Sequence, residues 1–323
     1  MQRKNADPTV ELLIPVYKPG EELAELLKKM TRQTHPLQAI HLLVTAGQSE
    51  YEQICETYRE WEGLRFTRID PAEFDHGGTR HLGASQSTAD ILMFMTQDAV
   101  PENEYLVEEL VKNMIKKTMA GSGEASIAAA YARQLPAADC NILERRTRQF
   151  NYPETSRVKT AADLPALGIK TYFCSNVCAA YRRDVYEKLG GFERRTIFNE
   201  DMIFAAGLIK AGYAVAYAAD ARVIHSHNYS GMQQLHRNFD LAVSQAEHPE
   251  IFDGVPSEGE GIRMVKTTAA WLCKNGKAYL LPKLVWQSGC KYLGYLLGKR
   301  YRKLPRKLVL WLTMNKRYWN EMR

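Results

Sequence analysis

Residues 90–101 read Asp-Ile-Leu-Met-Phe-Met-Thr-Gln-Asp-Ala-Val-Pro, and this stretch decides the fold. Its first six residues predict a buried strand that ends shortly before Asp98. Ligands of open α/β sheets bind beyond the carboxyl ends of the strands, where a carboxylate can hold a divalent cation. We therefore predict that Asp98 is a metal ligand. The alternative is that Asp98 caps a helix that begins near Pro101.

Strand-like and helix-like segments alternate on the N-terminal side of this stretch. Apolar runs predict further strands at residues 10–16, 40–44 and 65–69. Helical patterns lie between the strands, at residues 21–30, 51–61 and 79–87. This alternation predicts the α/β fold class, with a mostly parallel central sheet flanked by helices.

The later part of the chain is less regular. We predict strands at residues 125–131, 172–180, 214–218 and 223–225, and helices at residues 183–189 and 201–211. Residues 151–167 are rich in turn formers and predict a long surface loop. Helical patterns return after Ser230, with a loop expected at residues 248–261.

The composition narrows the class of protein. The 323 residues are 45% hydrophobic and 25% charged, as in ordinary globular proteins. The first nine residues are polar, so we expect no signal peptide, and the lack of an 18-residue apolar run predicts no membrane-spanning helix. The six cysteines lack the spacing of a zinc site, which predicts reduced thiols in a cytoplasmic protein.

The C-terminal segment, residues 262–323, is strongly basic. It contains 15 Lys and Arg and one acidic residue, whereas the whole chain carries a formal charge of +6. Leucines and aromatic residues recur around the cations of residues 299–307. This pattern favours an amphipathic helical tail on an anionic membrane surface. There are two alternatives: a basic helix packed on the body, and a nucleic-acid-binding segment. No nucleic-acid-binding signature supports the second, so we expect no nucleic-acid partner.

Two adjacent carboxylates, Glu200 and Asp201, follow Asn199 at a predicted helix start. Asn199 suits a helix cap, and acids at this position suit the helix dipole. A desolvated carboxylate beside another acid also has a raised pKa and can accept a proton. A catalytic carboxylate and a purely structural helix start therefore both remain open at this position.

Two histidines, His225 and His227, follow the last short strand. Alternate residues of an extended segment point to opposite faces, so we expect only one of the two imidazoles to enter a site. An imidazole beside a carboxylate suits a divalent metal, and the spacing does not choose which histidine joins Asp98.

Two glycines, Gly77 and Gly78, precede the third predicted helix. Glycines at a helix start let backbone N–H groups face an anion, and Arg80 can pair with a phosphate or a carboxylate. Paired glycines are also common in turns. The chain contains neither a G-x-G-x-x-G nor a P-loop pattern, which argues against a dehydrogenase or an NTPase.

Taken together, residues 9–230 resemble the family 2 glycosyltransferases, which have the GT-A fold. The opening strand with Ile14-Pro15-Val16-Tyr17 and the segment Thr96-Gln97-Asp98-Ala99 resemble the family's first strand and its D-x-D motif. The remaining matches are Arg32-Gln33-Thr34-His35-Pro36, which resembles N-Q-T-Y-P, and Gly190-Gly191-Phe192 with Asn199-Glu200-Asp201, which resembles G-G-F…E-D. Residues 74–83, 96–101, 151–153 and 225–230 look most like the bacterial rhamnosyltransferases of polysaccharide synthesis.

The sequence departs from the family pattern at two places. Thr45-Ala46-Gly47 stands where D-x-G-S is common, so the acid that contacts the nucleotide base in the family is missing. The D-x-D segment retains one acid, Asp98, so a bound metal would need a histidine or the diphosphate itself as a further ligand.

The resemblance implies inverting transfer of a sugar, with L-rhamnose from dTDP-rhamnose favoured, to a lipid-linked glycan acceptor. Asp201 would take the proton of the acceptor hydroxyl, with Glu200 shaping its environment. Mg²⁺ or Mn²⁺, held by Asp98 with His225 or His227, would stabilise the leaving diphosphate. The donor-binding residues would be Pro15, Val16, Tyr17, Gly77, Gly78, Arg80, Gln97 and Asp98.

We expect three regions: a GT-A domain over residues 1–230, a helix and linker over 231–262, and the basic amphipathic tail over 263–323. The tail would place the enzyme at the inner face of the cell membrane. A UDP-hexose or UDP-galactofuranose donor is the main alternative, and a catalytically idle glycan-binding or scaffold module is a further one. The oligomeric state stays open, a homo-oligomer included.

Overall fold

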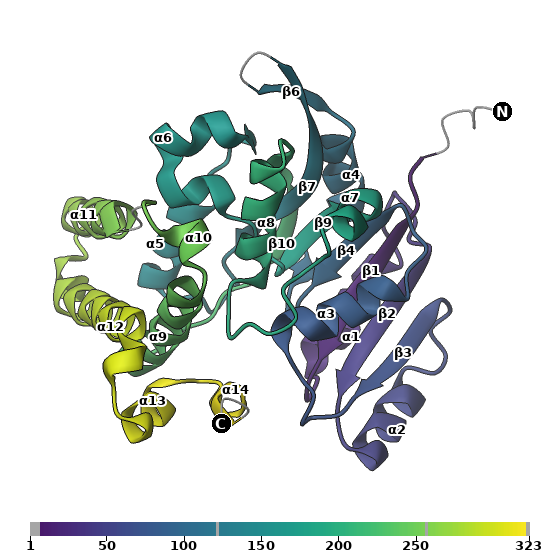
Figure 1. Ribbon diagram of the computed structural model, residues 1–323, viewed down its shortest axis with the longest axis horizontal. Helices are drawn as coiled ribbons and strands as arrows, with labels where there is room; N and C mark the ends of the chain where they lie inside the picture. Colours follow the sequence, from purple (N-terminus) through teal and green to yellow (C-terminus); the bar gives the residue numbers. More distant parts are fainter. Residues whose placement is uncertain (1–6, 121–122, 256–257, 321–323) are drawn as a thin grey trace.

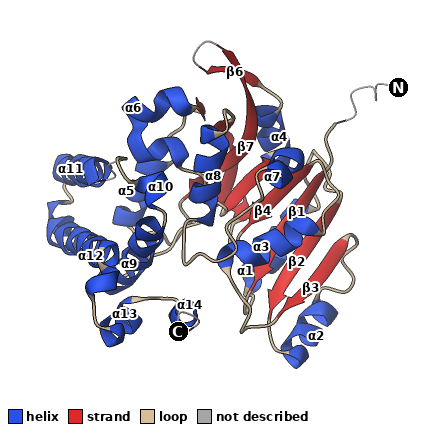
Figure 2. Ribbon diagram, in the orientation of Figure 1, coloured by secondary structure: helices blue, strands red, loops and turns tan. Residues whose placement is uncertain are grey.

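A ten-stranded mixed sheet runs through the computed structural model, which describes residues 7–120, 123–255 and 258–320 (Figure 1). The strand order is β3-β2-β1-β4-β9-β7-β10-β5, with β6 beside β7 and β8 beside β10. Helices cover both faces of this sheet (Figure 2). The predicted α/β class with a central sheet flanked by helices is therefore confirmed.

The N-terminal half is the parallel part of the sheet, as the strand–helix alternation predicts. β1 pairs in parallel with β2 and with β4, and β2 pairs in parallel with β3. The elements of this half are β1 (Val10–Val16), α1 (Glu21–Met30), β2 (Ala39–Thr45), α2 (Gln48–Thr57), β3 (Leu64–Ile69), α3 (His76–Ser85) and β4 (Ile91–Met95). The carboxyl ends of these strands therefore meet at one edge of the sheet, where Asp98 follows β4.

The sheet changes direction at β9, which is antiparallel to both β4 and β7, while β10 runs parallel to β7. The strands of this half are β5 (Val100–Pro101), β6 (Lys117–Ala120), β7 (Gly123–Leu135), β8 (Arg157–Lys159), β9 (Cys178–Arg182) and β10 (Ala214–Ile224). Its helices are α4 (Leu106–Met114), α5 (Ile142–Asn151), η1 (Ala161–Asp163), α6 (Leu164–Leu167), η2 (Gly168–Tyr172), α7 (Arg183–Lys188) and α8 (Glu200–Lys210).

Three expectations for this half were wrong. The predicted loop at residues 151–167 contains β8, η1 and α6. Strand β8 forms because it pairs with β10 and buries Lys159. The Lys159 Nζ donates to the Tyr131 hydroxyl at 3.2 Å. The strand expected at residues 172–180 begins only at Cys178, because η2 precedes it. The two strands expected at 214–218 and 223–225 form one strand, with a break in register between Ala218 and Arg222.

Two apolar layers hold the helices against the sheet. Side chains such as Leu12 and Ile14 of β1 meet Leu26 of α1 and Leu110 of α4 on one face. On the other face, Phe94 of β4 and the aromatic residues of α7 and α8 form a second buried cluster. Strands buried on both faces explain why β1 and β4 read as nearly continuous apolar runs.

The C-terminal helices gather at the end of the molecule opposite β3 (Figure 1). They are α9 (Gly231–Glu247), α10 (Pro249–Phe252), α11 (Glu258–Lys274), η3 (Ala278–Leu280), α12 (Leu281–Lys299), η4 (Tyr301–Lys303), α13 (Arg306–Leu312) and α14 (Lys316–Asn320). The loop expected at residues 248–261 is thus partly helical, and residues 256–257 lie outside the described residues. In the described part of the chain, no helix is long and apolar enough to cross a membrane.

Helix α12 packs closely along α9 because two glycines of α12 face α9. A Cβ at Gly294 would lie 2.2 Å from the Leu235 carbonyl oxygen, and one at Gly298 would lie 2.3 Å from that of Phe239. Leu312 and Trp319, further along the basic segment, are buried in the same apolar cluster as Phe239. The basic segment therefore packs on the body over much of its length. A basic helix packed on the body was one of the two alternatives to a membrane-bound tail.

Candidate active site

Asp98 lies in the loop between β4 and β5, at the carboxyl edge of the parallel strands. The next helix, α4, begins only at Leu106, and its N-cap position is Tyr105. The alternative that Asp98 caps a helix near Pro101 is therefore wrong, because Pro101 belongs to a strand paired with β10. Asp98 is left facing the loop that follows β10.

Both histidines of that loop reach Asp98. The Oδ2 atom of Asp98 lies 3.6 Å from His225 Nε2 and 3.3 Å from His227 Nε2. The candidate ligand atoms of the three residues all lie within 4.8 Å of one another. The expectation that only one histidine enters the site was wrong, because strand pairing ends at Ile224 and the alternation of an extended strand no longer applies.

The charges in this cluster suit a divalent cation. Burial opposes ionisation of Asp98, but the two imidazoles and the Thr96 hydroxyl hold the pKa of its carboxyl well below the usual value. Burial and the neighbouring His225 lower the pKa of His227 to about 4, against the opposing effect of Asp98. A carboxylate and a neutral imidazole are the forms that bind a metal.

Gln134, near the end of β7, fixes the orientation of His225. Its Oε1 atom lies 3.1 Å from His225 Nδ1, so the ring donates through Nδ1 and leaves Nε2, the atom nearer Asp98, free to coordinate. Arg148 of α5 also donates to the same Gln134 oxygen. Such outer hydrogen bonds are typical of metal-binding histidines, and the three residues therefore fit Mg²⁺ or Mn²⁺.

The second centre is Asp201, at the start of α8. Its carboxyl accepts hydrogen bonds from the backbone N–H of Asn176 at 2.9 Å and of Met202 at 2.7 Å. Burial, reinforced by the neighbouring Glu200, nevertheless raises the pKa of Asp201 to about 7. A carboxyl with a pKa near the operating pH is suited to accept a proton from a substrate.

Glu200 is the charged partner in this centre. Burial opposes its ionisation, but Arg80 and His76 lower the pKa of the carboxyl. Arg80 Nη1 lies 3.2 Å from Glu200 Oε1, and both side chains are less than a tenth exposed. The predicted role of Arg80 as a donor clamp stays a prediction, and in this structure its guanidinium is paired with Glu200.

The glycines at the start of α3 have a different role from the one predicted. The N–H groups of Gly77 and Gly78 donate to the Asp75 carboxylate at 2.9 and 2.7 Å, so the chain supplies its own anion there. A Cβ at Gly77 would lie 1.7 Å from the Glu193 carbonyl oxygen. The two glycines thus serve helix capping and close packing, and their amides are not free for a donor phosphate.

Asn199 likewise departs from its predicted role as a capping side chain. It adopts a left-handed conformation with φ of 66°, which asparagine tolerates, and its side chain makes no cap hydrogen bond. The side-chain amide instead donates to the Leu241 carbonyl of α9 at 3.2 Å. Asn199 therefore ties the catalytic helix start to the C-terminal helices.

The ends of β1 and β4 are joined by Gln97. Its side chain accepts from the Tyr17 N–H and donates to the Tyr17 carbonyl, both at 2.9 Å. The Tyr17 ring is half-exposed beside this link, whereas Val16 is buried in the core and Pro15 is only partly exposed. Among these predicted donor residues, Tyr17 presents the most accessible side chain.

A short hydrogen-bonded path connects the two centres. Gln134, which holds His225, also donates to the Ser175 hydroxyl at 3.0 Å. The next residue, Asn176, donates its backbone N–H to Asp201 and its side-chain amide to Glu200 at 3.2 Å. Through the Ser175–Asn176 peptide, this path links the metal cluster to the carboxyl with the raised pKa.

Three residues near the two centres were not predicted from the sequence: Gln134, Asn176 and Arg237. Arg237 of α9 lies over the rings of Phe198 and Tyr229, with its Cζ 4.7 and 5.7 Å from their centroids. Across the described ranges it makes no hydrogen bond or ion pair. No sequence signal marked it, because Asp240 stands three residues later at the spacing of a helical ion pair, whereas in the fold the Asp240 carboxylate accepts from Thr313 and Met314.

Comparison with known proteins agrees with this geometry. The family model described as glycosyl transferase family 2 matches residues 11–190. The O-antigen chain rhamnosyltransferases WbaN of Salmonella anatum and RfbN of Salmonella typhimurium are each 38% identical to the chain. The alignments cover 98% of the chain and 97% of WbaN, and 97% of the chain and 96% of RfbN.

Solved structures share the fold at low sequence identity. The mannosyltransferase PcManGT from Pyrobaculum calidifontis, in complex with GDP-Man and Mn²⁺, has a TM-score of 0.61 at 16% identity, over 93% of this chain and 89% of that one. Residues 1–349 of S. aureus TarS give 0.52 at 13% identity, over 91% of each chain. These likenesses confirm the GT-A fold. The family match and the two relatives that are 38% identical show that the chain belongs to glycosyltransferase family 2.

Proposed function

We propose that this glycosyltransferase transfers L-rhamnose, with inversion, from dTDP-rhamnose to a hydroxyl of a lipid-linked glycan. The observation that carries the choice of sugar is the 38% identity, along almost the whole chain, to two O-antigen chain rhamnosyltransferases. The chemistry of transfer rests on the site itself, where a metal-binding cluster adjoins a carboxyl with a raised pKa.

Asp201 acts as the base in this proposal. The acceptor hydroxyl must lose a proton as its oxygen attacks the anomeric carbon, and Asp201, with a pKa raised to about 7, can take that proton at neutral pH. Glu200 is held ionised by Arg80, so its negative charge keeps the affinity of Asp201 for a proton high. Arg80 and Glu200 therefore set the basicity of Asp201.

Asp98, His225 and His227 would hold Mg²⁺ or Mn²⁺, which would supply positive charge opposite the leaving diphosphate. Gln134 keeps the His225 ring oriented for that role. Tyr17, exposed beside Gln97, is the side chain best placed at this edge to lie against the donor nucleotide.

A donor panel tests the choice of sugar. Calorimetry would compare dTDP-rhamnose with UDP-glucose and UDP-galactofuranose, each with and without Mn²⁺. We expect binding of dTDP-rhamnose that depends on Mn²⁺, followed by transfer once an acceptor glycan is added. Binding of a UDP-sugar without binding of dTDP-rhamnose would overturn the donor, and binding without any transfer or hydrolysis would favour an idle module.

The proposal also places the enzyme on the inner, cytoplasmic face of the cell membrane, where a lipid-linked acceptor lies. The support is one face of α12, where Val285, Trp286, Tyr292 and Leu293 are each about half or more exposed. This helix lies in the basic segment, and apolar and aromatic side chains among cations suit the interface of an anionic bilayer.

A surface substitution tests membrane binding better than a truncation. Removing residues 280–323 would also remove buried side chains such as Leu312 and Trp319 and so unfold the α9 region. Leu293→Glu changes only the exposed face, and Ile115→Glu, on an exposed residue of the N-terminal half, is the matched control. We expect Leu293→Glu alone to weaken binding to phosphatidylglycerol vesicles, and binding equal to that of Ile115→Glu would remove this part of the proposal.

A further inference from the structure

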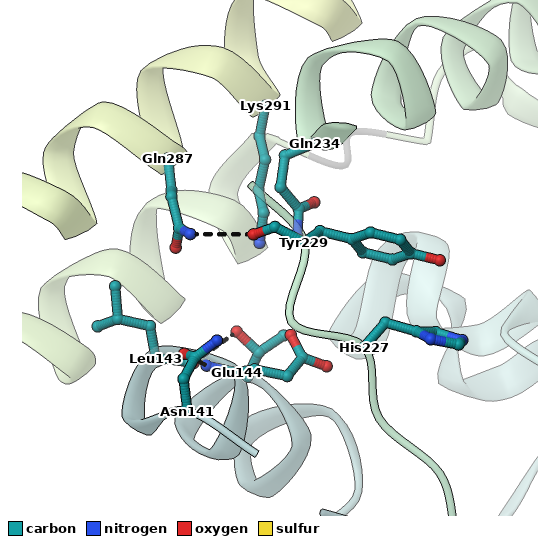
Figure 3. Close-up of a pocket in the computed structure, with 9 residues that line it drawn as sticks. Asn141, Leu143, Glu144, His227, Tyr229, Gln234, Gln287 and Lys291 are labelled. Atoms are coloured by element: carbon teal, nitrogen blue, oxygen red, sulfur yellow. Dashed lines mark hydrogen bonds between the residues drawn. The ribbon is translucent and has the colours of Figure 1, made fainter. Parts of the chain in front are cut away.

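A small polar pocket lies beside the metal cluster, between α5, α9 and α12 (Figure 3). His227 belongs to both the pocket and the cluster. The other polar residues that line the pocket include Asn141, Glu144, Tyr229, Gln234, Gln287 and Lys291. The cavity volume is about 10 Å³, which is room for one oxygen-sized group.

Lys291 of α12 reaches into this pocket without a partner (Figure 3). Its Nζ makes no hydrogen bond or ion pair with any residue that the structure describes. Burial lowers the pKa of its ammonium group. The Glu144 carboxylate opposes this shift, and repulsion by Arg148 and Arg237 adds to it. An ammonium group that is desolvated and unpaired is unfavourable, so an acceptor from outside the chain would stabilise it.

The one acid of the pocket is already engaged. Glu144 Oε1 accepts from Arg148 Nε at 2.6 Å, one turn away on α5. Gln287 is also committed, since its side-chain amide donates to the Tyr229 carbonyl at 3.2 Å. Neither residue therefore neutralises Lys291, which is the cation among the residues that line the pocket.

A second cation without a counter-ion lies nearby. Arg237 contributes to the electrostatic environment of both Lys291 and His227, and the Tyr229 ring that lines the pocket lies under its guanidinium. Two unpaired cations next to a metal-binding cluster favour a ligand that carries more than one negative charge. A sugar hydroxyl would satisfy the hydrogen bond of Lys291 but not these charges.

We propose that the pocket binds one phosphate oxygen of a substrate diphosphate through Lys291, while the rest of the diphosphate lies at the Asp98–His225–His227 cluster. The inference rests on the proposed function in one respect, that a nucleotide-sugar and a lipid-linked glycan meet at this site. Each of these substrates contains a diphosphate, and either can be the source of the oxygen. By this inference α12, a part of the basic segment, contributes directly to the substrate site.

The test is Lys291→Met, which removes the ammonium and keeps the length of the side chain. The matched control is Lys28→Met, an exposed lysine of α1. Calorimetry with dTDP and Mn²⁺ measures the donor arm, and the KM for a synthetic lipid-diphosphate glycan measures the acceptor arm. We expect one of the two constants to rise about 10- to 100-fold, the size of a lost hydrogen bond to a charged group.

The outcomes distinguish the two possible sources of the phosphate oxygen. They also distinguish failure of this inference from failure of the proposed donor. A higher Kd for dTDP assigns the pocket to the donor. A higher KM for the acceptor with unchanged dTDP binding assigns the pocket to the lipid diphosphate. Both constants within twofold of those of Lys28→Met would overturn the proposal. Thermal denaturation checks the fold, which should survive because the substitution breaks no hydrogen bond or ion pair of Lys291 with the residues that the structure describes. If the wild-type protein prefers a UDP-sugar, the same titration with UDP still tests the pocket although the proposed donor has failed.

Discussion

Asp98 and Asp201 are two carboxylic acids of one site with opposite pKa shifts. Asp98 lies between two imidazoles, and they hold its pKa below the usual value although burial opposes this. Asp201 lies beside an ionised glutamate in a buried position, and its pKa rises to about 7. The neighbours rather than the residue type therefore decide which acid can hold a cation and which can accept a proton.

The largest effect should come from removing the base. Asp201→Asn keeps the size of the side chain but cannot accept the proton, so we expect transfer to fall about 10²- to 10⁴-fold. A radiolabelled-sugar assay measures the rate. Transfer near the wild-type level in this variant would show that the base is elsewhere.

The charge pair that supports Asp201 can be broken separately. Arg80→Met leaves Glu200 as an uncompensated buried charge, and we expect a loss of about 3–5 kcal/mol in the free energy of unfolding at pH 8. Urea denaturation measures it. The double variant Arg80→Met/Glu200→Gln should recover much of the loss, because it removes both charges. A loss below about 1 kcal/mol in the single variant would mean that the pair is not essential to the site.

On the Asp98 side, Gln134 offers a milder perturbation. Gln134→Leu removes the hydrogen bond that orients His225, so we expect the affinity for Mn²⁺ to fall about 10- to 100-fold. Calorimetry with Mn²⁺ measures the affinity. Thr147→Val is a control, because the Thr147 hydroxyl donates to the Leu143 carbonyl and not to the metal cluster, so Mn²⁺ binding should not change. Equal affinities in both variants would contradict the assigned role of Gln134.

The smallest effect concerns pH. Transfer should increase as the pH rises to about 7, because Asp201 must lose its proton to act as a base. Stability should move the other way. Asp75 and Asp201 have folded-state pKa values of about 6 and 7, above the ordinary value of 3.8, so their contribution is fully present below pH 4 and is lost as the pH rises to about 7. A flat activity profile between pH 5 and 8 would contradict the pKa shift of Asp201.

The sequence predicted the parts of the molecule that repeat a local pattern. The parallel half and the position of Asp98 follow from strands and helices that alternate with clear periodicity, and Glu200-Asp201 lies at a helix start as expected. The roles that failed depend on contacts between distant segments. Gly77 and Gly78 were expected to meet a ligand, but Asp75 and the Glu193 carbonyl occupy that space, and no local pattern reveals this.

The basic segment shows the same limit. Its composition predicts an amphipathic helix but cannot say which apolar residues are already used in packing on α9. In the fold, Leu312 and Trp319 are buried while Trp286 and Leu293 remain exposed, so one segment both packs on the body and presents an apolar face. Lys291 could not be distinguished from the other cations by sequence, because its isolation depends on how α12 lies against α5.

The division of roles between the two acids is the central claim, and one titration tests it most directly. Binding of dTDP-rhamnose in the presence of Mn²⁺ would be measured by calorimetry for Asp98→Asn and Asp201→Asn side by side. We predict that Asp201→Asn keeps wild-type affinity for the donor and that Asp98→Asn loses the Mn²⁺-dependent part of it. Equal loss in both variants, or loss only in Asp201→Asn, would contradict the account.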